Sequence, residues 1–341
     1  MPQAVLTALL VALILAAPAD QGYAQNRASI DLPAAGLVEI LGGQLGVGCW
    51  QVYRWESFPD VYIVHFENYL LQGRALNRMA TYCEKVGTRG RVLSDRQLAY
   101  YLRQNNYSTE NLYSAHDYRT SDLASLYNAA RAAGQQLGEE ELAIQGALAD
   151  LGLLRWDADE ERWRATGEQA VLSFATRYLG REQPSCELLG RPDRRFEAHA
   201  LYHESRHGLY FTEPQYAARC REYWHDVLGA DDREVLRLVL LANDYDAADE
   251  ELMINEWQAY LLTPAHDYVG LTALSGGLRR IASGQWRPRG LSYPQLQLVQ
   301  RHGDRLAADL ENWMADDLRR WLGPAWDVPA VKDINSLRGG G

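Results

Sequence analysis

Residues 196–211 read FEAHALYHESRHGLYF, and the interpretation of the whole chain depends on this stretch. At its centre, positions 203–207 form an HExxH pentad in a segment without proline. Residues four apart lie on the same face of a helix, so His203 and His207 can present two imidazole nitrogens to one point. Two imidazoles and a neighbouring carboxylate are what a catalytic Zn²⁺ needs, with Glu204 as base for the bound water. The pattern predicts a helical site for one Zn²⁺ per chain.

The alternative interpretation is a helix whose histidines are ordinary surface or core groups. Against it, most of the segment is apolar, and one stripe at helical spacing contains Phe196, His199, Ala200, His203 and His207. Two histidines and a glutamate on such a helix would be costly to bury without a partner, and a metal ion is such a partner. His199, one turn before the pentad, is expected behind the ligands or in the core.

A second stretch supplies a third ligand. Residues 249–262 read DEELMINEWQAYLL, with acidic residues in the first turn and Thr263-Pro264 at the expected helix end. Glu256 shares one helical face with Leu252 and Tyr260, which predicts that its carboxylate is buried. An unpaired buried glutamate is rare, so Glu256 is expected to bind the metal.

An HExxH pentad followed by a separate helix with Asn255-Glu256-x-x-Ala259 resembles the gluzincin metallopeptidases of the thermolysin and aminopeptidase N kind. The resemblance implies that His203, His207 and Glu256 hold zinc and that Glu204 is the general base. It also implies that Asn255 and Tyr260 lie behind the ligands, with His199 as a further candidate.

The chain departs from those families in two respects, and the first is that Glu256 stands farther from the pentad than their third ligand does. His225 and Asp226 stand closer and are rival third ligands. Where thermolysin has an aspartate that steadies a zinc-bound histidine, this chain has Tyr260. These families usually add a downstream tyrosine or histidine that stabilises the oxyanion, and the candidates here are His266, Tyr268, Tyr293 and His302.

The first residues predict export. Residues 4–17 are an uncharged apolar run too short to span a bilayer, so residues 1–24 are interpreted as a signal peptide, with an uncleaved N-terminal anchor as the alternative. A periplasmic or secreted protein follows, without stable membrane insertion after signal removal. Its four cysteines then suggest two disulfides, and sequential pairing gives Cys49–Cys83 and Cys186–Cys220.

The remaining pattern predicts a mainly α (α+β) fold. A small mixed α/β N-terminal region spans 25–92, with strands at 49–55 and 61–66 and a helix at 67–85 whose Arg74 and Arg78 face solvent. A helical region with a small hairpin spans 93–185 and includes a helix at 167–179. A helical, zincin-like catalytic region spans 186–330, and a disordered tail spans 331–341.

A net charge of −11 argues against nucleic acid or an anionic membrane as a partner. The sequence therefore predicts an exported zinc metallopeptidase that acts on a peptide or protein substrate. Two alternatives stay open: a non-catalytic helical envelope scaffold or binding protein with a metal-stabilised core, and a zinc hydrolase of a non-peptide amide.

Overall fold

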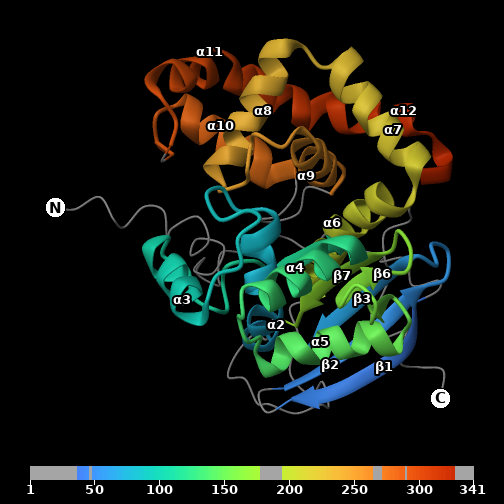
Figure 1. Ribbon diagram of the computed structural model, residues 1–341. Coiled ribbons are helices and arrows are strands. Elements are labelled where there is room, and N and C mark those ends of the chain that lie inside the picture. Colours follow the sequence, from blue (N-terminus) through green and yellow to red (C-terminus); the bar gives the residue numbers. More distant parts are fainter. Residues whose placement is uncertain (1–36, 46–47, 177–193, 264–270, 289, 327–341) are drawn as a thin grey trace.

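The computed structural model describes residues 37–45, 48–176, 194–263, 271–288 and 290–326 (Figure 1). The predicted signal peptide, Cys186, His266, Tyr268 and the predicted tail lie outside the described residues. Within the described part of the chain, no helix has the length and apolarity that crossing a membrane requires.

The fold is mainly α with a small mixed sheet, as the sequence predicts. The helices are α2 (Tyr69–Cys83), α3 (Asp95–Gln104), α4 (Thr120–Ala132), α5 (Glu139–Asp150), α6 (Arg194–Thr212), α7 (Pro214–Glu222), α8 (Ala230–Ala242), α9 (Glu250–Leu262), α10 (Leu271–Ala282), α11 (Tyr293–Asp309) and α12 (Ala315–Leu322). Two π-turns, η1 (Tyr223–Val227) and η2 (Leu310–Met314), and a 3₁₀ turn, η3 (Pro324–Trp326), complete the set.

A five-stranded sheet has the strand order β1-β2-β3-β7-β4. Its strands are β1 (Leu37–Leu45), β2 (Gly48–Trp55), β3 (Val61–Phe66), β4 (Ala115–Arg119) and β7 (Ala170–Ala175), and only the β3–β7 pair is parallel. A separate hairpin joins β5 (Leu154–Asp157) to β6 (Arg162–Ala165). The predicted strands at 49–55 and 61–66 and the hairpin are confirmed.

The helix expected at 167–179 is wrong, because residues 170–175 form the strand β7. This segment reads AVLSFA, and all six residues are buried. A strand covered on both faces is apolar throughout, and a short apolar run of that kind has no period that separates strand from helix. The error matters for the site, because β7 is the strand on which the zinc-motif helix packs most extensively.

Helices cover both faces of the sheet (Figure 1). Alternate strand residues belong to two separate cores: Val171 packs with α2, α4 and α5, whereas Leu172 packs with the helices from α6 to α12. Figure 1 shows α6 between the sheet and the helical layer formed by α7 to α12. The motif helix is therefore the central element of the larger core.

Burial of α6 is continuous from His199 to Tyr210. The helix runs through Gly208, and a Cβ there would lie 3.1 Å from Leu172 Cδ1 and from Val61 Cγ1. Glycine at this position lets the helix backbone approach the sheet closely. It does not end the helix, which continues to Thr212.

A short backbone seam ties the sheet side of the molecule to the helical layer. Lys85 forms an isolated antiparallel bridge with Tyr245. The Val86 N–H donates to the Asp244 carbonyl at 3.2 Å, and the Asp246 N–H donates to the Glu84 carbonyl at 3.1 Å. This seam fixes the segment after α2 against the segment before α9.

Arg78 does not face solvent, contrary to expectation. Its side chain is buried, and its Nε donates to Glu141 on α5 at 2.7 Å, while Arg74 is 44% exposed as predicted. The guanidinium also bonds Asp95 and the Leu93 carbonyl. Arg78 therefore joins α2, α5 and the start of α3, which a helical period cannot reveal.

The predicted disulfide pairing is also wrong, since Cys83 and Cys220 are both free thiols. The Cys49 N–H bonds Glu67 just before α2, whereas Cys83 is the last residue of that helix. A 15-residue helix is about 22 Å long, so Cys49 and Cys83 lie at opposite ends of it. Cys220 is fully buried in the larger core, and Cys49 is engaged in a disulfide.

Candidate metal centre

Three predicted ligands come together where α6 crosses α9. The Nε2 atoms of His203 and His207 lie 3.1 Å apart, and Glu256 Oε2 lies 3.9 Å from His207 Nε2. All three side chains are buried, and each offers one donor atom within 4.8 Å of the others. The i, i+4 spacing on α6 aligns the two imidazoles, and Glu256 reaches them from the facing helix.

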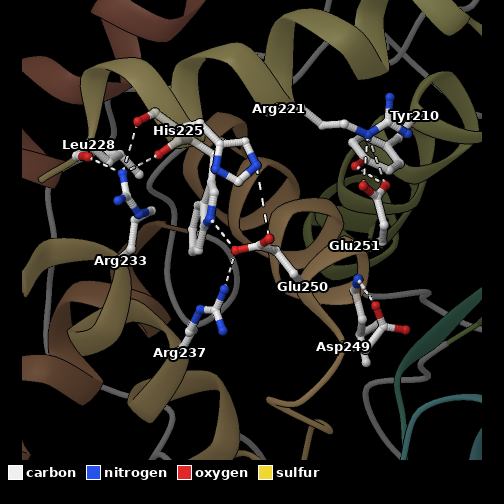
Figure 2. Close-up of polar contacts among 11 residues, drawn as sticks. Tyr210, Arg221, His225, Leu228, Arg233, Arg237, Asp249, Glu250 and Glu251 are labelled. Carbon is white, nitrogen blue, oxygen red and sulfur yellow. Dashed lines mark hydrogen bonds and ion pairs between the residues drawn. The ribbon is translucent and has the colours of Figure 1, made fainter. Parts of the chain in front are cut away.

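The start of α9 is anchored by polar contacts from α6, α7, η1 and α8 (Figure 2). Asp249 caps the helix through the Leu252 N–H and also bonds Arg89. Glu250 bonds Arg237 of α8 and accepts from Trp224 Nε1 of η1 at 3.4 Å. Glu251 accepts from Arg221 Nε and from the Tyr210 hydroxyl, both at 2.8 Å. These contacts fix the position of the helix that carries Glu256.

The other ring nitrogen of each imidazole faces a polar group. His207 Nδ1 lies 3.4 Å from Asp117 Oδ2 on the edge strand β4, and His203 Nδ1 lies 3.4 Å from Thr263 Oγ1. Asn255 Nδ2 donates to the same Asp117 oxygen at 3.3 Å. Groups of this kind behind metal-binding histidines fix the ring orientation and tautomer. The Tyr260 ring packs edge-on against His203, with the ring centroids 4.7 Å apart.

Both imidazoles are kept neutral by their surroundings. Burial lowers the pKa of His207 to about 4 and lowers the pKa of His203 as well, with His207 lowering it further. A neutral imidazole has a free lone pair for a metal ion. The protein therefore offers both histidines in the form that binds a cation.

Four carboxylates line one cavity of about 60 Å³: Glu84, Asp117, Glu204 and Glu256. Burial raises the pKa of Glu84 and of Asp117 to about 8, and burial followed by the neighbouring carboxylates raises those of Glu204 and Glu256. The buried ammonium of Lys85, the residue next to Glu84, acts on Glu84 and Glu256. Arg119 is a second neighbouring cation, which acts on Asp117, so four ionised carboxylates exceed the two cations by two charges, which favours binding of a further cation.

Glu204 extends from the motif helix into this cavity. Its Oε2 is buried and has no hydrogen-bond partner, and the same holds for Glu256 Oε2. Asp117, Glu204 and His207 also form a second set with donor atoms within 4.8 Å. His207 belongs to both sets, since its Nε2 faces Glu256 and its Nδ1 faces Asp117.

Tyrosines complete the cavity wall. Tyr113, Tyr245 and Tyr260 line it, and the hydroxyls of Tyr245 and Tyr260 lie 3.5 Å apart. The Tyr113 hydroxyl is buried without a hydrogen-bond partner. Lys85 Nζ lies 4.2 Å from the centre of the Tyr113 ring.

A larger groove of about 300 Å³ adjoins this cavity, and Glu84 and Asp117 line both spaces. Rings of Tyr82, Tyr118, Tyr210 and Phe211 form part of its wall. The groove lies between the end of α2, the start of α4, the end of α6 and the start of α9. A ligand in the groove that reaches the imidazoles would pass the two shared carboxylates.

Several candidate residues lie elsewhere. The rival ligands His225 and Asp226 lie on η1, where both are exposed and His225 faces Glu250. Tyr293 is exposed on α11, and His302 lies 3.5 Å from Asp231, so neither lines the cavity. His199 is buried on α6, one turn before His203.

The sequence interpretation missed five residues at the site: Glu84, Lys85, Tyr113, Asp117 and Tyr245. Their sequence signals were weak, because acidic residues and tyrosines outside a motif are usually surface groups. The one local hint was Asp117, a charged residue within the short strand-like run AHDYR.

The site fits a zinc ion on its own geometry. Ligands 2.0–2.1 Å from a tetrahedral zinc are about 3.3 Å apart, close to the 3.1 Å between the two imidazole nitrogens. The 3.9 Å between His207 and Glu256 requires a shift of about 0.6 Å. The donor types, two imidazoles and one carboxylate, are those of catalytic zinc.

Comparison with models of known families, with curated proteins and with solved structures found no match to this chain.

Proposed function

We propose that this protein is an exported zinc-dependent peptidase in which His203, His207 and Glu256 hold one Zn²⁺ and Glu204 is the general base. The observation that carries the proposal is the convergence of these four buried side chains on one cavity. Three protein donors leave a coordination position for water or substrate, as in catalytic zinc sites. A purely structural site would more often have a fourth protein ligand.

A zinc ion held by these three residues would lower the pKa of a water and polarise the scissile carbonyl. Glu204 takes the proton from that water and passes it to the leaving amine. The carboxylate suits the task because Oε2 has no competing hydrogen bond. Burial and the nearby carboxylates also raise its pKa, which strengthens it as a base.

Asp117 and Thr263 are positioning residues in this scheme. Asp117 Oδ2 lies 3.4 Å from His207 Nδ1, where its carboxylate would favour a proton on Nδ1 and leave the Nε2 lone pair for the metal. Thr263 lies against His203 Nδ1 and donates its hydroxyl to the Ala259 carbonyl at 2.6 Å. The Asp117 contact comes from strand β4, and the Thr263 contact comes from the residue that caps the end of α9.

Metal analysis and a hydrolysis assay test the proposal together. The purified protein should contain about one Zn²⁺ per chain and should cleave members of a fluorogenic peptide library. Glu204→Gln keeps the side-chain shape but cannot accept the proton. It should retain zinc while hydrolysis falls on the order of 10²–10⁴-fold.

The matched control is Glu222→Gln, the same exchange at an exposed position of α7. It should change neither zinc content nor hydrolysis. Wild-type protein that binds zinc but cleaves no peptide above a metal-stripped sample would refute the peptidase. A parallel panel of non-peptide amides then separates another hydrolase from a metal-stabilised scaffold.

A further inference from the structure

The metal cavity is closed in this structure. Its volume of about 60 Å³ holds a few water molecules, whereas sites that bind small molecules are on the order of 300–1,000 Å³. His203, His207, Glu204 and Glu256 are each at most 7% exposed. A molecule much larger than water therefore reaches the imidazoles only after part of the cavity wall has moved.

Most of this wall is held firmly. Helices α6 and α9 belong to the larger core, β4 is paired with β7, and the backbone seam fixes Glu84 and Tyr245. The remaining part is Tyr113 with Ser114, which lie in the loop between α3 and β4. We define α3 together with this loop, residues 95–114, as the flap.

The flap is weakly attached to the rest of the molecule. Figure 1 shows α3 at the outer edge, and this helix makes no extensive contact with another helix or strand of the described ranges. The flap packs through a small cluster of three buried residues, Ala80 of α2 with Leu102 and Leu112, which is separate from the two main cores. Few buried apolar contacts and an irregular backbone give a segment a low free energy of local opening.

The inner side of the flap rests on α2. Asn77 Nδ2 donates to the Thr109 carbonyl at 2.8 Å, and a Cβ at Gly73 would clash with that carbonyl. At the start of the flap, Asp95 bonds the buried guanidinium of Arg78. All these contacts come from α2, so α2 is the element on which the flap can turn.

Two contacts among the described residues hold the flap toward the helical layer. The Tyr107 hydroxyl donates to Asp244 Oδ2 at 3.0 Å. Lys85 Nζ lies 4.2 Å from the centre of the Tyr113 ring and 5.3 Å from that of Tyr245. Asp244 and Tyr245 belong to the seam before α9, so both contacts cross from the flap side to the helical side.

We propose that the flap is a hinged cover of the metal cavity, latched by the hydrogen bond from Tyr107 to Asp244. It opens by turning on α2 away from the helical layer, which withdraws Tyr113 and Ser114 from the cavity wall. Such a cover serves any ligand of the cavity, so it does not depend on the peptidase. In the proposed peptidase, substrate enters past the open flap and reacts under the closed one.

Chemical labelling of the two imidazoles tests this in the metal-free protein. Diethyl pyrocarbonate reacts with neutral histidines and is too large for the closed cavity. Site-resolved mass spectrometry follows the modification of His203 and His207 under native conditions. His65, buried on β3, measures labelling through global unfolding in the same sample.

Tyr107→Phe removes only the hydroxyl of the latch. A hydrogen bond to a charged group is strong enough that His203 and His207 should be labelled about tenfold faster, with His65 changed less than about twofold. Asp244→Asn keeps a weaker acceptor and should act in the same direction by a smaller factor. The matched control is Tyr100→Phe, the same exchange at a 59% exposed position of α3, which should label as wild type.

Equal labelling of His203 and His207 in wild type and Tyr107→Phe would overturn the proposal. Hydrogen exchange identifies the reason. Faster exchange at residues 105–114 without faster labelling would show that the flap moves without opening the cavity. Faster labelling in Glu84→Ala but not in Tyr107→Phe would place the entrance at the wall shared with the groove, which also overturns the proposal.

These measurements need neither zinc nor catalysis, so they fail separately from the test of the peptidase. If Tyr107→Phe exposes the imidazoles but the protein cleaves no peptide, the flap covers the site of a binding protein. If peptides are cleaved and Tyr107→Phe labels as wild type, the peptidase stands and the flap is not its cover.

Discussion

Replacing Asp117 by asparagine should weaken zinc binding without removing a ligand. Asp117 Oδ2 lies 3.4 Å from His207 Nδ1 and is positioned by Asn255. Loss of a group that orients a metal-binding histidine typically costs 10–100-fold in metal affinity, which is about 1.4–2.7 kcal/mol. Asparagine keeps the size of the side chain but loses the negative charge that faces His207 Nδ1.

The same change has the opposite effect on the metal-free protein. Burial raises the pKa of Asp117 to about 8, so the folded protein either keeps this carboxyl protonated or buries its charge. Asparagine removes that cost, and the metal-free variant should be more stable than the wild type at pH 8. Weaker zinc binding with higher metal-free stability distinguishes this role from general damage to the fold.

Denaturant unfolding in buffers of fixed free zinc measures both quantities. At free zinc of 1,000 times the wild-type Kd, zinc stabilises the wild type by about 4.1 kcal/mol. A 100-fold weaker variant should gain only about 1.4 kcal/mol under the same conditions. The control is Asp226→Asn at the exposed rival position on η1, which should behave as wild type. Unchanged zinc affinity in Asp117→Asn, or an equal loss in Asp226→Asn, would refute the reasoning.

Three further predictions concern the cysteines, the cavity carboxyls and the packing of α6 on the sheet. Thiol labelling of the native protein should modify Cys83, which is partly exposed, whereas fully buried Cys220 should react only after unfolding. Between pH 6.5 and 8 the metal-free protein should lose stability, because the folded-state pKa values of Glu84 and Asp117 are raised to about 8 and the unfolded chain releases these protons at lower pH. Over this range each carboxyl lowers the free energy of unfolding by about 2 kcal/mol at most. Urea unfolding of the zinc-loaded protein in parallel should show a smaller decrease of this free energy with pH. Gly208→Ala should lower the free energy of unfolding in urea by about 1–3 kcal/mol, because the added methyl group meets two side chains of the sheet at 3.1 Å. An unchanged unfolding midpoint would show that the sheet side chains move aside at no cost.

The sequence could predict the part of the site that lies within single helices. The i, i+4 spacing of His203 and His207 and the buried face of Glu256 are set by helical periodicity, and the structure brings these side chains together. It could not predict Glu84 or Asp117, because they reach the cavity from the end of α2 and from an edge strand. Their approach depends on how the layers pack, and one chain's residue pattern does not contain that information.

The same distinction explains the errors in the fold. The strand at 49–55 alternates between buried and less buried residues, so its period is visible in the sequence, and the strand at 61–66 is marked by the turn at 56–60 before it. β7 is buried on both faces and has no period, so its sequence does not distinguish it from a helix. A helical period alone predicts an exposed Arg78, because the buried Glu141 that pairs with it lies on another helix.

The seam between residues 84–86 and 244–246 divides the site between two parts of the chain. All three proposed zinc ligands follow residue 194, whereas Glu84, Lys85 and Asp117 precede residue 176. If the polypeptide were expressed as two fragments separated between these points, the second would contain every donor atom and the first the charged wall around them. Association of the two fragments would then be coupled to zinc affinity, and the zinc affinity of the reassembled pair would measure how accurately the fragments dock.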